Sequence, residues 1–184
     1  MTRIASWPAL AGAILALSLL GCGQKQTNIA RPLPLEPTSV SVSYFCAMGV
    51  LEHGGPKGQI FLEGKSEPVW FGSVRDVFAF MMLPEEPKKI VAIYVNDMAK
   101  ARNWERPEAG DWVEARAAWY VLGSDYTGGM GGKEAVPFSL EAAARGFAHD
   151  HGGEVLRFSE VPESYILEAT PPSDKPAAGA TIAD

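Results

Sequence analysis

The segment FCAM at residues 45–48 places a thiol, Cys46, and a thioether, Met48, two positions apart. We expect the segment to be extended, so that residues i and i+2 lie on the same side and the two sulfur atoms point the same way. Thiolate and thioether are soft donors that favour Cu(I), whereas zinc would require more histidine or a second thiolate. A thioether has no proton to lose, so only Cys46 would make metal binding depend on pH. The pair predicts a soft metal site, with a core position as the simpler alternative for Met48.

Two further side chains are candidate ligands. Met130 lies in the sequence TGGMGG at residues 127–132, where glycines leave it little apolar context and would let the backbone approach a site. A turn between two strands is the other explanation of these glycines. His53 follows Met48 in the chain, and its imidazole could complete a three- or four-coordinate site or lie in a surface turn. We therefore predict a Cu(I) site made of Cys46, Met48 and Met130, with His53 as a further candidate.

Other residues of the same types have different explanations. His149 and His151 lie near the predicted end of a helix, where a positively charged imidazole interacts favourably with the helix dipole. Met98 ends a predicted strand and is only a reserve candidate ligand. The sequence has no G-x-S-x-G, P-loop, G-x-G-x-x-G or H-E-x-x-H motif, so we do not expect an enzyme. The alternative is a thiol-dependent redox protein in which Cys46 acts together with a histidine.

The N-terminus has the pattern of a lipoprotein export signal. Arg3 precedes an uncharged stretch whose most apolar part, residues 10–20, has signal-peptide length and is short for a membrane span. The sequence LLGC that ends at Cys22 resembles the bacterial lipobox, in which a peptidase cuts before a cysteine that becomes acylated. Several acyl chains on Cys22 would anchor the protein stably on the periplasmic side of a membrane, and a transmembrane anchor is the alternative. Gly23, where an aspartate often retains lipoproteins in the inner membrane, favours the outer membrane.

Cysteine content and charge narrow the function further. The chain has two cysteines, and if Cys22 carries lipid, Cys46 has no partner for an intramolecular disulfide in an oxidising compartment. Cys46 is then either a buried, inert residue or a metal ligand. The formal net charge is −6 and becomes more negative once Arg3 is removed. We therefore expect no cationic patch and no binding to nucleic acid.

The composition divides the chain into five parts. A signal peptide is expected over residues 1–21, and the acylated cysteine with a flexible, proline-containing linker over residues 22–40. Residues 171–184 lack large apolar groups and are expected to be disordered. Between them we predict an α+β fold of two similar small subdomains, 41–102 and 103–170, packed together.

Each subdomain is expected to have the order strand, strand, helix, strand. In both, a serine is the predicted N-cap of the helix: Ser73 in the first and Ser139 in the second. Hydrophobic periodicity places the elements of the first unit at 59–62, 68–71, 74–82 and 90–95. The elements of the second unit are placed at 113–122, 135–138, 140–148 and 154–158.

Short motifs recur along the chain in a distinctive order: the lipobox, CAM at 46–48, HGGPKGQI at 53–60, FGS at 71–73, VNDM at 95–98, GSD at 123–125, MG at 130–131 and VPF at 136–138. In their order and spacing these motifs resemble the NosL family. The resemblance spans residues 41–160 and implies two related ββαβ units. It also implies an accessory lipoprotein that delivers Cu(I) to nitrous oxide reductase, above all to its copper–sulfide cluster, and that docks on the associated NosDFY transporter complex.

The resemblance also carries over individual ligands. At matching positions it implies Cys46 and Met48, with Met130 as the third ligand. Many relatives read C-G-M, sometimes with an additional upstream cysteine, whereas this chain has Ala47 and no second thiol. A site with two thiolates is therefore not available here.

Overall fold

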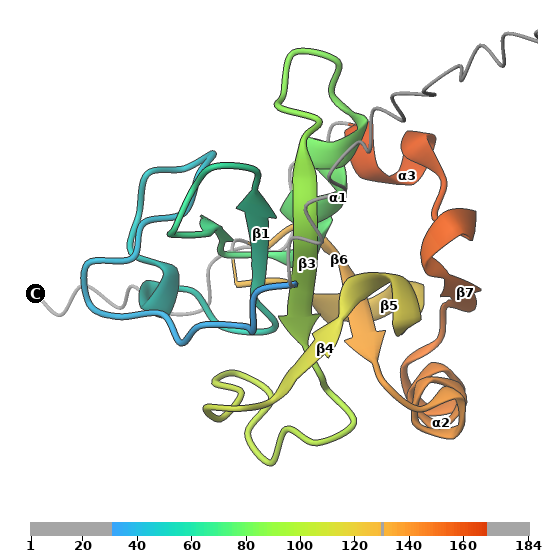
Figure 1. Cartoon of the computed structure of the whole chain (residues 1–184). Helices are drawn as coiled ribbons and strands as arrows, with labels where there is room; N and C mark the ends of the chain where they lie inside the picture. The colour runs from blue at the N-terminus through green and yellow to red at the C-terminus, as the bar shows by residue number, and fades with distance from the viewer. Residues whose placement is uncertain (1–30, 130, 169–184) are drawn as a thin grey trace, which may run out of the picture. The chain divides into compact units, whose positions relative to one another are not determined.

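Two antiparallel sheets, each built by a strand–strand–helix–strand unit, make up the folded part of the chain (Figure 1). The computed structural model describes residues 31–129 and 131–168. The predicted signal peptide, Cys22, Met130 and the tail at 171–184 lie outside these residues. Within the described ranges, no helix is long and apolar enough to cross a membrane.

The two units share one topology. In each, the first strand lies in the centre of its sheet, and the strand that follows the helix pairs antiparallel with it. The predicted α+β fold with two similar ββαβ units is therefore confirmed. The first unit has β1 (Gly58–Leu62), β2 (Val69–Phe71), α1 (Val74–Met82) and β3 (Ile90–Asn96), and the second has β5 (Trp119–Thr127), β6 (Lys133–Phe138), α2 (Glu141–His151) and β7 (Glu154–Arg157). Shorter elements are the 3-10 helices Val50–Glu52, Ala115–Ala117 and Phe158–Glu160, and α3 (Glu163–Leu167).

The single long strand predicted at 113–122 is wrong. The chain forms β4 (Trp112–Glu114), turns through the 3-10 helix Ala115–Ala117, and only then begins β5. Ala115 is fully buried, and its carbonyl accepts the hydroxyl hydrogen of Tyr120 at 2.7 Å, which fixes the turn. β4 pairs with β3, so the first sheet has a fourth strand from beyond residue 102. The boundary between 102 and 103 stays a prediction.

Helix α1 begins where its sequence predicts. The Ser73 hydroxyl accepts the backbone N–H of Asp76 at 3.2 Å, which satisfies one of the free donors of the first turn. Its apolar face is buried, and full burial of a side chain such as Phe78 is worth roughly 1.5–3 kcal/mol. The core around this face includes Ile60 of the first sheet and Tyr120 of the second, so one cluster packs the two units together.

The predicted cap of α2 is wrong. The N-cap is Leu140, without a side-chain hydrogen bond, and the backbone N–H of Ser139 donates to Asp97 Oδ1 at 2.8 Å. Asp97 follows β3 and is fully buried, so it ties the end of β3 to the end of β6. The next residue, Met98, is 3% exposed and packs in the hydrophobic core of the second unit.

Residues 31–40 belong to the predicted linker and have no regular secondary structure. They are nevertheless bonded to the folded part of the chain. The side-chain amide of the buried Gln59 forms two hydrogen bonds with the backbone of Leu35, both 2.9 Å. Glu36 Oε1 accepts from the indole N–H of Trp112 at 2.9 Å and from the backbone of Gly110 at 2.8 Å.

Candidate metal site

Cys46 lies in a tight loop, not in an extended segment. Val42 and Gly49 form an antiparallel bridge, and the backbone N–H of Ala47 donates to the carbonyl of Ser43 at 2.9 Å. Ala47 has a φ of 56°, in the left-handed region. The extended geometry predicted for the CAM motif is therefore wrong, and its two sulfur donors are placed by a turn. Within the loop Cys46 is partly exposed.

The left-handed φ gives a physical reason for glycine in the C-G-M form of the motif. An alanine in this conformation is disfavoured by about 1–2 kcal/mol, because its Cβ crowds the following carbonyl. We expect Ala47→Gly to raise the free energy of unfolding by about 0.5–1 kcal/mol, after the greater unfolded-state entropy of glycine is subtracted. Urea denaturation measures this change. The exposed Ala142 of α2 is the control, since Ala142→Gly should destabilise by about 1 kcal/mol. Two losses of equal size would contradict the explanation.

His53 is brought to Cys46 by the 3-10 helix Val50–Glu52. Cys46 Sγ and His53 Nε2 are 3.5 Å apart, and the His53 side chain is buried at 5% exposure. A thiolate and a neutral imidazole at this separation are two donors that can share a soft metal ion after a small shift. Met48 is 47% exposed at the same loop, so its thioether is accessible from solvent. The structure therefore brings Cys46 and His53 together, and Met48 belongs to the same loop as Cys46.

The His53 imidazole packs directly against Gly72, which lies between β2 and α1. A Cβ on Gly72 would lie 2.6 Å from His53 Cδ2, closer than real Cβ contacts. The backbone N–H of Gly72 donates to the Ser43 hydroxyl at 3.1 Å, so Gly72 is also bonded to the loop that carries Cys46. The FGS sequence at 71–73 contributes to the family resemblance, but sequence reasoning assigned it no role at the site. Nothing local in that sequence indicates a contact with His53.

We expect Gly72→Ala to weaken Cu(I) binding by about ten- to a hundredfold, because the new methyl group displaces the imidazole from Cys46. Competition with a Cu(I) chelator under anaerobic conditions measures the affinity. Gly146 in α2 is the matched control, since a Cβ there meets no atom within 4 Å. An unchanged affinity in a folded Gly72→Ala protein would remove His53 from the ligand set.

The loop at residues 127–132, which we call the glycine loop, contacts Gly54, the residue after His53, through Gly129. A Cβ on Gly129 would lie 2.5 Å from both the nitrogen and the oxygen of Gly54, so the two backbones are in direct contact. The loop is closed on itself, because the backbone N–H of Gly131 donates to the carbonyl of Gly128 at 2.7 Å. Met130 itself lies outside the described residues. The contact shows why a glycine is needed at 129, which the sequence suggested only in general terms.

A buried lysine fixes the turn after His53. Lys57 Nζ donates to the carbonyl of Gly54 at 3.0 Å and also to that of Gly55, and Lys57 is 6% exposed. Burial lowers the pKa of Lys57 to about 8, opposed by the negative charges of Glu134 and Glu105. At neutral pH the ammonium therefore still holds the two carbonyls of this turn.

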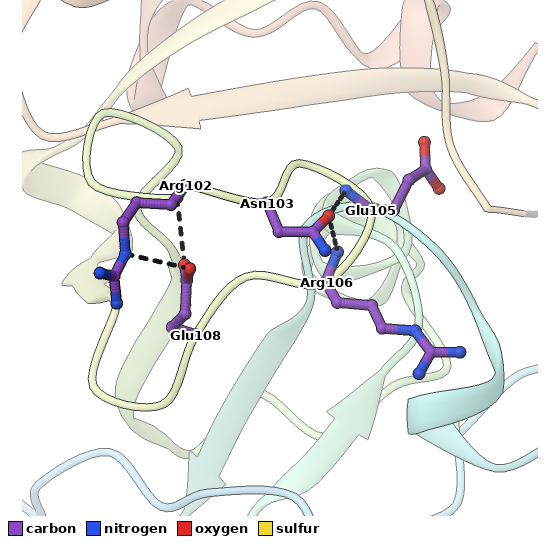
Figure 2. A network of polar contacts seen from close by, with 5 residues as sticks. All are labelled: Arg102, Asn103, Glu105, Arg106 and Glu108. Carbon is purple, nitrogen blue, oxygen red and sulfur yellow. Dashed lines mark hydrogen bonds and ion pairs between the residues drawn. The ribbon is translucent and has the colours of Figure 1, made fainter.

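The segment between β3 and β4 is hydrogen-bonded to the turn that follows His53, at residues 54–57. Figure 2 shows that Asn103 Oδ1 accepts the backbone N–H groups of Glu105 and Arg106, at 3.0 and 3.2 Å. The carbonyl of Glu105 in turn accepts the N–H of Gly55 at 2.9 Å. Beside this segment is a cleft of about 320 Å³, lined in part by His53, Lys57, Glu105, Arg106 and Trp112.

Two buried carboxyl groups interact electrostatically with residues of this region, Asp76 with His53 and Glu134 with Lys57. Asp76 in the first turn of α1 has a buried Oδ2 atom with no hydrogen-bond partner, and burial raises its pKa, opposed by Arg75 and His53. Glu134 on β6 is 1% exposed, and burial raises its pKa to about 7. Glu134 accepts the backbone N–H of Arg75 at 2.9 Å, so it connects β6 to α1.

The remaining histidines are away from these residues. His149 and His151 are exposed and pair with Asp150 and Asp125, at 2.8 and 2.9 Å. Within residues 31–129 and 131–168, no group of three or more histidine, cysteine, aspartate and glutamate side chains is placed to hold a metal ion. A thiol, an imidazole and the thioether of Met48 are the soft donors that the described residues offer in this region, and they suit a soft ion.

Fold and site define a class of protein: a small α+β domain in which a partly exposed thiol and a buried imidazole form a pair suited to a soft metal ion. A family model described as NosL matches residues 34–166. The chain therefore belongs to the NosL family, as its motifs predicted.

Known relatives agree with this assignment. Over 165 residues the chain is 41% identical to the copper-binding lipoprotein NosL of Achromobacter cycloclastes, covering 89% of this chain and 84% of that protein. It is 32% identical over 160 residues to the copper-binding lipoprotein NosL of Stutzerimonas stutzeri, covering 87% and 82%. The crystal structure of the copper chaperone NosL from Shewanella denitrificans has a TM-score of 0.67 at 32% identity, covering 72% of this chain and 97% of that one.

Proposed function

We propose that this protein is a lipid-anchored periplasmic copper chaperone that binds Cu(I) at Cys46 and delivers it for maturation of nitrous oxide reductase. The Cys46–His53 pair at 3.5 Å carries the proposal, because it gives the single free thiol of the described residues a second donor. Relatives named copper-binding lipoprotein and copper chaperone support the choice of metal. The monovalent state follows from the soft donors.

The proposed ligands are Cys46, Met48 and Met130, with His53 as a further donor. Met48 is exposed beside Cys46, and Gly129 contacts Gly54, the residue after His53. The contact between Gly129 and Gly54 supports Met130, the residue after Gly129, as a ligand. One thiolate with neutral partners binds Cu(I) with modest charge, so the cargo can leave by ligand replacement when a partner supplies its own soft donors.

Cys22 is proposed to carry the lipid anchor, in the outer membrane, and the recipients are proposed to be nitrous oxide reductase and the NosDFY transporter complex. The names of the relatives support the lipoprotein assignment. The recipients rest on the motif resemblance. Metabolic labelling with a fatty-acid analogue, compared between the wild type and Cys22→Ala, tests the anchor directly.

Anaerobic Cu(I) titration against a competing chelator tests the site. We expect one equivalent of Cu(I) to bind, and Met48→Leu and Met130→Leu each to weaken binding by about tenfold or more. Met98→Leu is the matched control, because Met98 lies in the core of the second unit. Delivery is tested by adding the copper-loaded protein to copper-free nitrous oxide reductase and measuring its activity. Equal activation by free Cu(I) at the same concentration would contradict a chaperone role.

A thiol-dependent redox protein is the second candidate, because the Cys46–His53 pair also fits a thiolate nucleophile activated by an imidazole. Turnover of thiol or sulfenate substrates would support it if a copper chelator left the rate unchanged. Loss of all turnover on adding the chelator would exclude it.

A further inference from the structure

One ring nitrogen of His53 has no hydrogen bond to any described residue. Nε2 lies 3.5 Å from Cys46 Sγ, whereas Nδ1 has no such partner, although His53 is only 5% exposed. The other two histidines of the chain, His149 and His151, each pair Nδ1 with an aspartate, at 2.8 and 2.9 Å. A histidine that binds a metal through one ring nitrogen almost always donates its other N–H to a carboxylate, a carbonyl or a water. A partner for Nδ1 of His53 is therefore what the proposed copper site lacks.

A buried carboxyl oxygen is also without a hydrogen bond. Within residues 31–129 and 131–168, two carboxyl oxygens are buried without a hydrogen-bond donor, Oδ2 of Asp76 and Oδ2 of Asp97. Asp97 Oδ2 forms an ion pair with Lys100 at 3.3 Å, which leaves Asp76 Oδ2 as the unexplained atom. Buried polar atoms almost always have a partner in native proteins, so an exception needs a physical reason. A donor that approaches Asp76 only when copper is bound would supply that reason.

The two atoms belong to side chains that lie close together. Asp76 and His53 interact electrostatically, and the charge of His53 opposes the rise in the pKa of Asp76 that burial causes. The start of α1 brings them together, because the His53 ring packs against Gly72 and the next residue, Ser73, accepts the backbone N–H of Asp76 at 3.2 Å. Asp76 also lines a small cavity of about 40 Å³ together with Gly128 of the glycine loop. Asp76 is therefore near both His53 and the glycine loop.

A second carboxylate near His53 is that of Glu105. It lines the same cleft as the imidazole, and Figure 2 shows no bond from its carboxylate to the neighbouring residues of its segment. Glu105 is exposed, so water already satisfies its oxygens, and a hydrogen bond from His53 would only replace one from water. Asp76 Oδ2 is buried away from water, so a hydrogen bond from the same donor is a net gain. Burial therefore favours Asp76 over Glu105.

We propose that Asp76 is a positioning residue of the copper site and accepts the Nδ1–H of His53 when copper binds at Nε2. This deepens the proposed function and rests on it, because His53 acts here as a copper ligand. The hydrogen bond holds the proton on Nδ1, leaves the lone pair of Nε2 to the metal and makes the imidazole a stronger donor. It is absent from this structure, so a rotation of one side chain accompanies copper binding. The same bond satisfies the buried Oδ2 atom.

The first test measures Cu(I) affinity by chelator competition, with the full lipidated chain in detergent under anaerobic conditions. Asp76→Asn should bind Cu(I) about tenfold more weakly than the wild type, which is a typical effect of removing the partner of a metal-bound histidine. Its free energy of unfolding at pH 7 should not fall, because burial disfavours the charge that the substitution removes. Asp150→Asn is the matched control and should bind Cu(I) as the wild type does, because Asp150 pairs with Nδ1 of the exposed His149.

The second test observes the proton on Nδ1 directly. In protein with isotope-labelled histidine and bound Cu(I), which is diamagnetic, the Nδ1–H of His53 should give an NMR signal, because the carboxylate of Asp76 holds the proton away from water. Asp76→Asn should lose this signal by exchange with water, whereas Asp150→Asn should keep it. His53→Gln identifies the signal. A purely structural role of Asp76 would leave the signal in place.

The outcomes separate this inference from the proposed function. An Asp76→Asn protein that binds Cu(I) as tightly as the wild type would overturn the proposal, and a loss of affinity in Glu105→Gln would then assign the hydrogen bond to the carboxylate in the cleft. So would a weaker Asp76→Asn protein whose Nδ1–H signal is unchanged, since charge alone would explain the loss. Failure of the wild type to take up Cu(I) would refute the proposed function, and this inference with it.

Discussion

Replacing Cys46 with serine is expected to lower the Cu(I) affinity of the protein by about a thousandfold, equivalent to about 4 kcal/mol. The thiolate is the one anionic donor among the proposed ligands, and a hydroxyl is a hard, un-ionised substitute. The variant also loses the sulfur that lies 3.5 Å from His53 Nε2. Chelator competition under anaerobic conditions measures the loss. Cys46 is partly exposed, so the substitution should change the free energy of unfolding by less than about 1 kcal/mol.

The same titration has a second readout. Binding of Cu(I) to a thiol releases a proton, so wild-type affinity should rise with pH wherever the free thiol is protonated. On the alkaline side of neutrality the Cys46→Ser protein should lose this dependence, because thioethers have no proton to release and imidazole binds a metal as the neutral base. Met98→Leu should keep both the affinity and the pH dependence, since Met98 is a core residue. A Cys46→Ser protein that binds Cu(I) as tightly as the wild type would place the metal elsewhere.

What the sequence predicted correctly depends on local patterns. Helix α1 follows from the spacing of its apolar residues and from Ser73, whose cap involves a neighbour three positions away. The repeat of two ββαβ units follows from the order of such elements. The strand predicted at 113–122 failed because burial of Ala115 and the hydrogen bond from Tyr120 turn the chain, and both depend on tertiary packing.

The candidate site shows the same limit. Residue types alone made Cys46, Met48 and His53 candidate ligands, because soft donors are uncommon and occur close together in this sequence. Their geometry was not predictable, since the left-handed Ala47 turns the chain between the two sulfur donors. Gly72 was missed as a part of the site because its contact with His53 spans two separate elements.

The buried acid behind the site should control how stability depends on pH. Burial raises the pKa of Glu134 to about 7, opposed by its hydrogen bonds from the backbone N–H groups of Arg75 and Ala135, each 2.9 Å. Asp76 adds to the rise, and Lys57 opposes it. The folded protein therefore keeps the Glu134 proton up to a higher pH than the unfolded chain, whose carboxyl has the ordinary glutamate pKa of 4.5. Folding takes up a proton between these two values.

We expect the free energy of unfolding to fall as pH rises through this window, by about 3 kcal/mol from Glu134 alone. The contribution is fully present below the unfolded pKa and lost above the folded one. Glu134→Gln should flatten the profile and leave the protein more stable than wild type at pH 8, because an amide is not ionised. The gain should be smaller than 3 kcal/mol, since Lys57 loses a charge partner. Urea denaturation between pH 5 and 8 measures both.

A second substitution separates the charge of Glu134 from its hydrogen bonds. Glu134→Leu removes the ionisable group too, but it leaves the buried N–H of Ala135 and the N–H of Arg75 without their acceptor. Each unpaired buried donor costs about 1–3 kcal/mol, so the leucine variant should be less stable than the glutamine variant at every pH. The exposed Glu154→Gln should leave the profile unchanged. If Glu134→Gln kept the wild-type slope, the uptake of the proton would belong to another group, and Asp76 beside His53 would be the first to test.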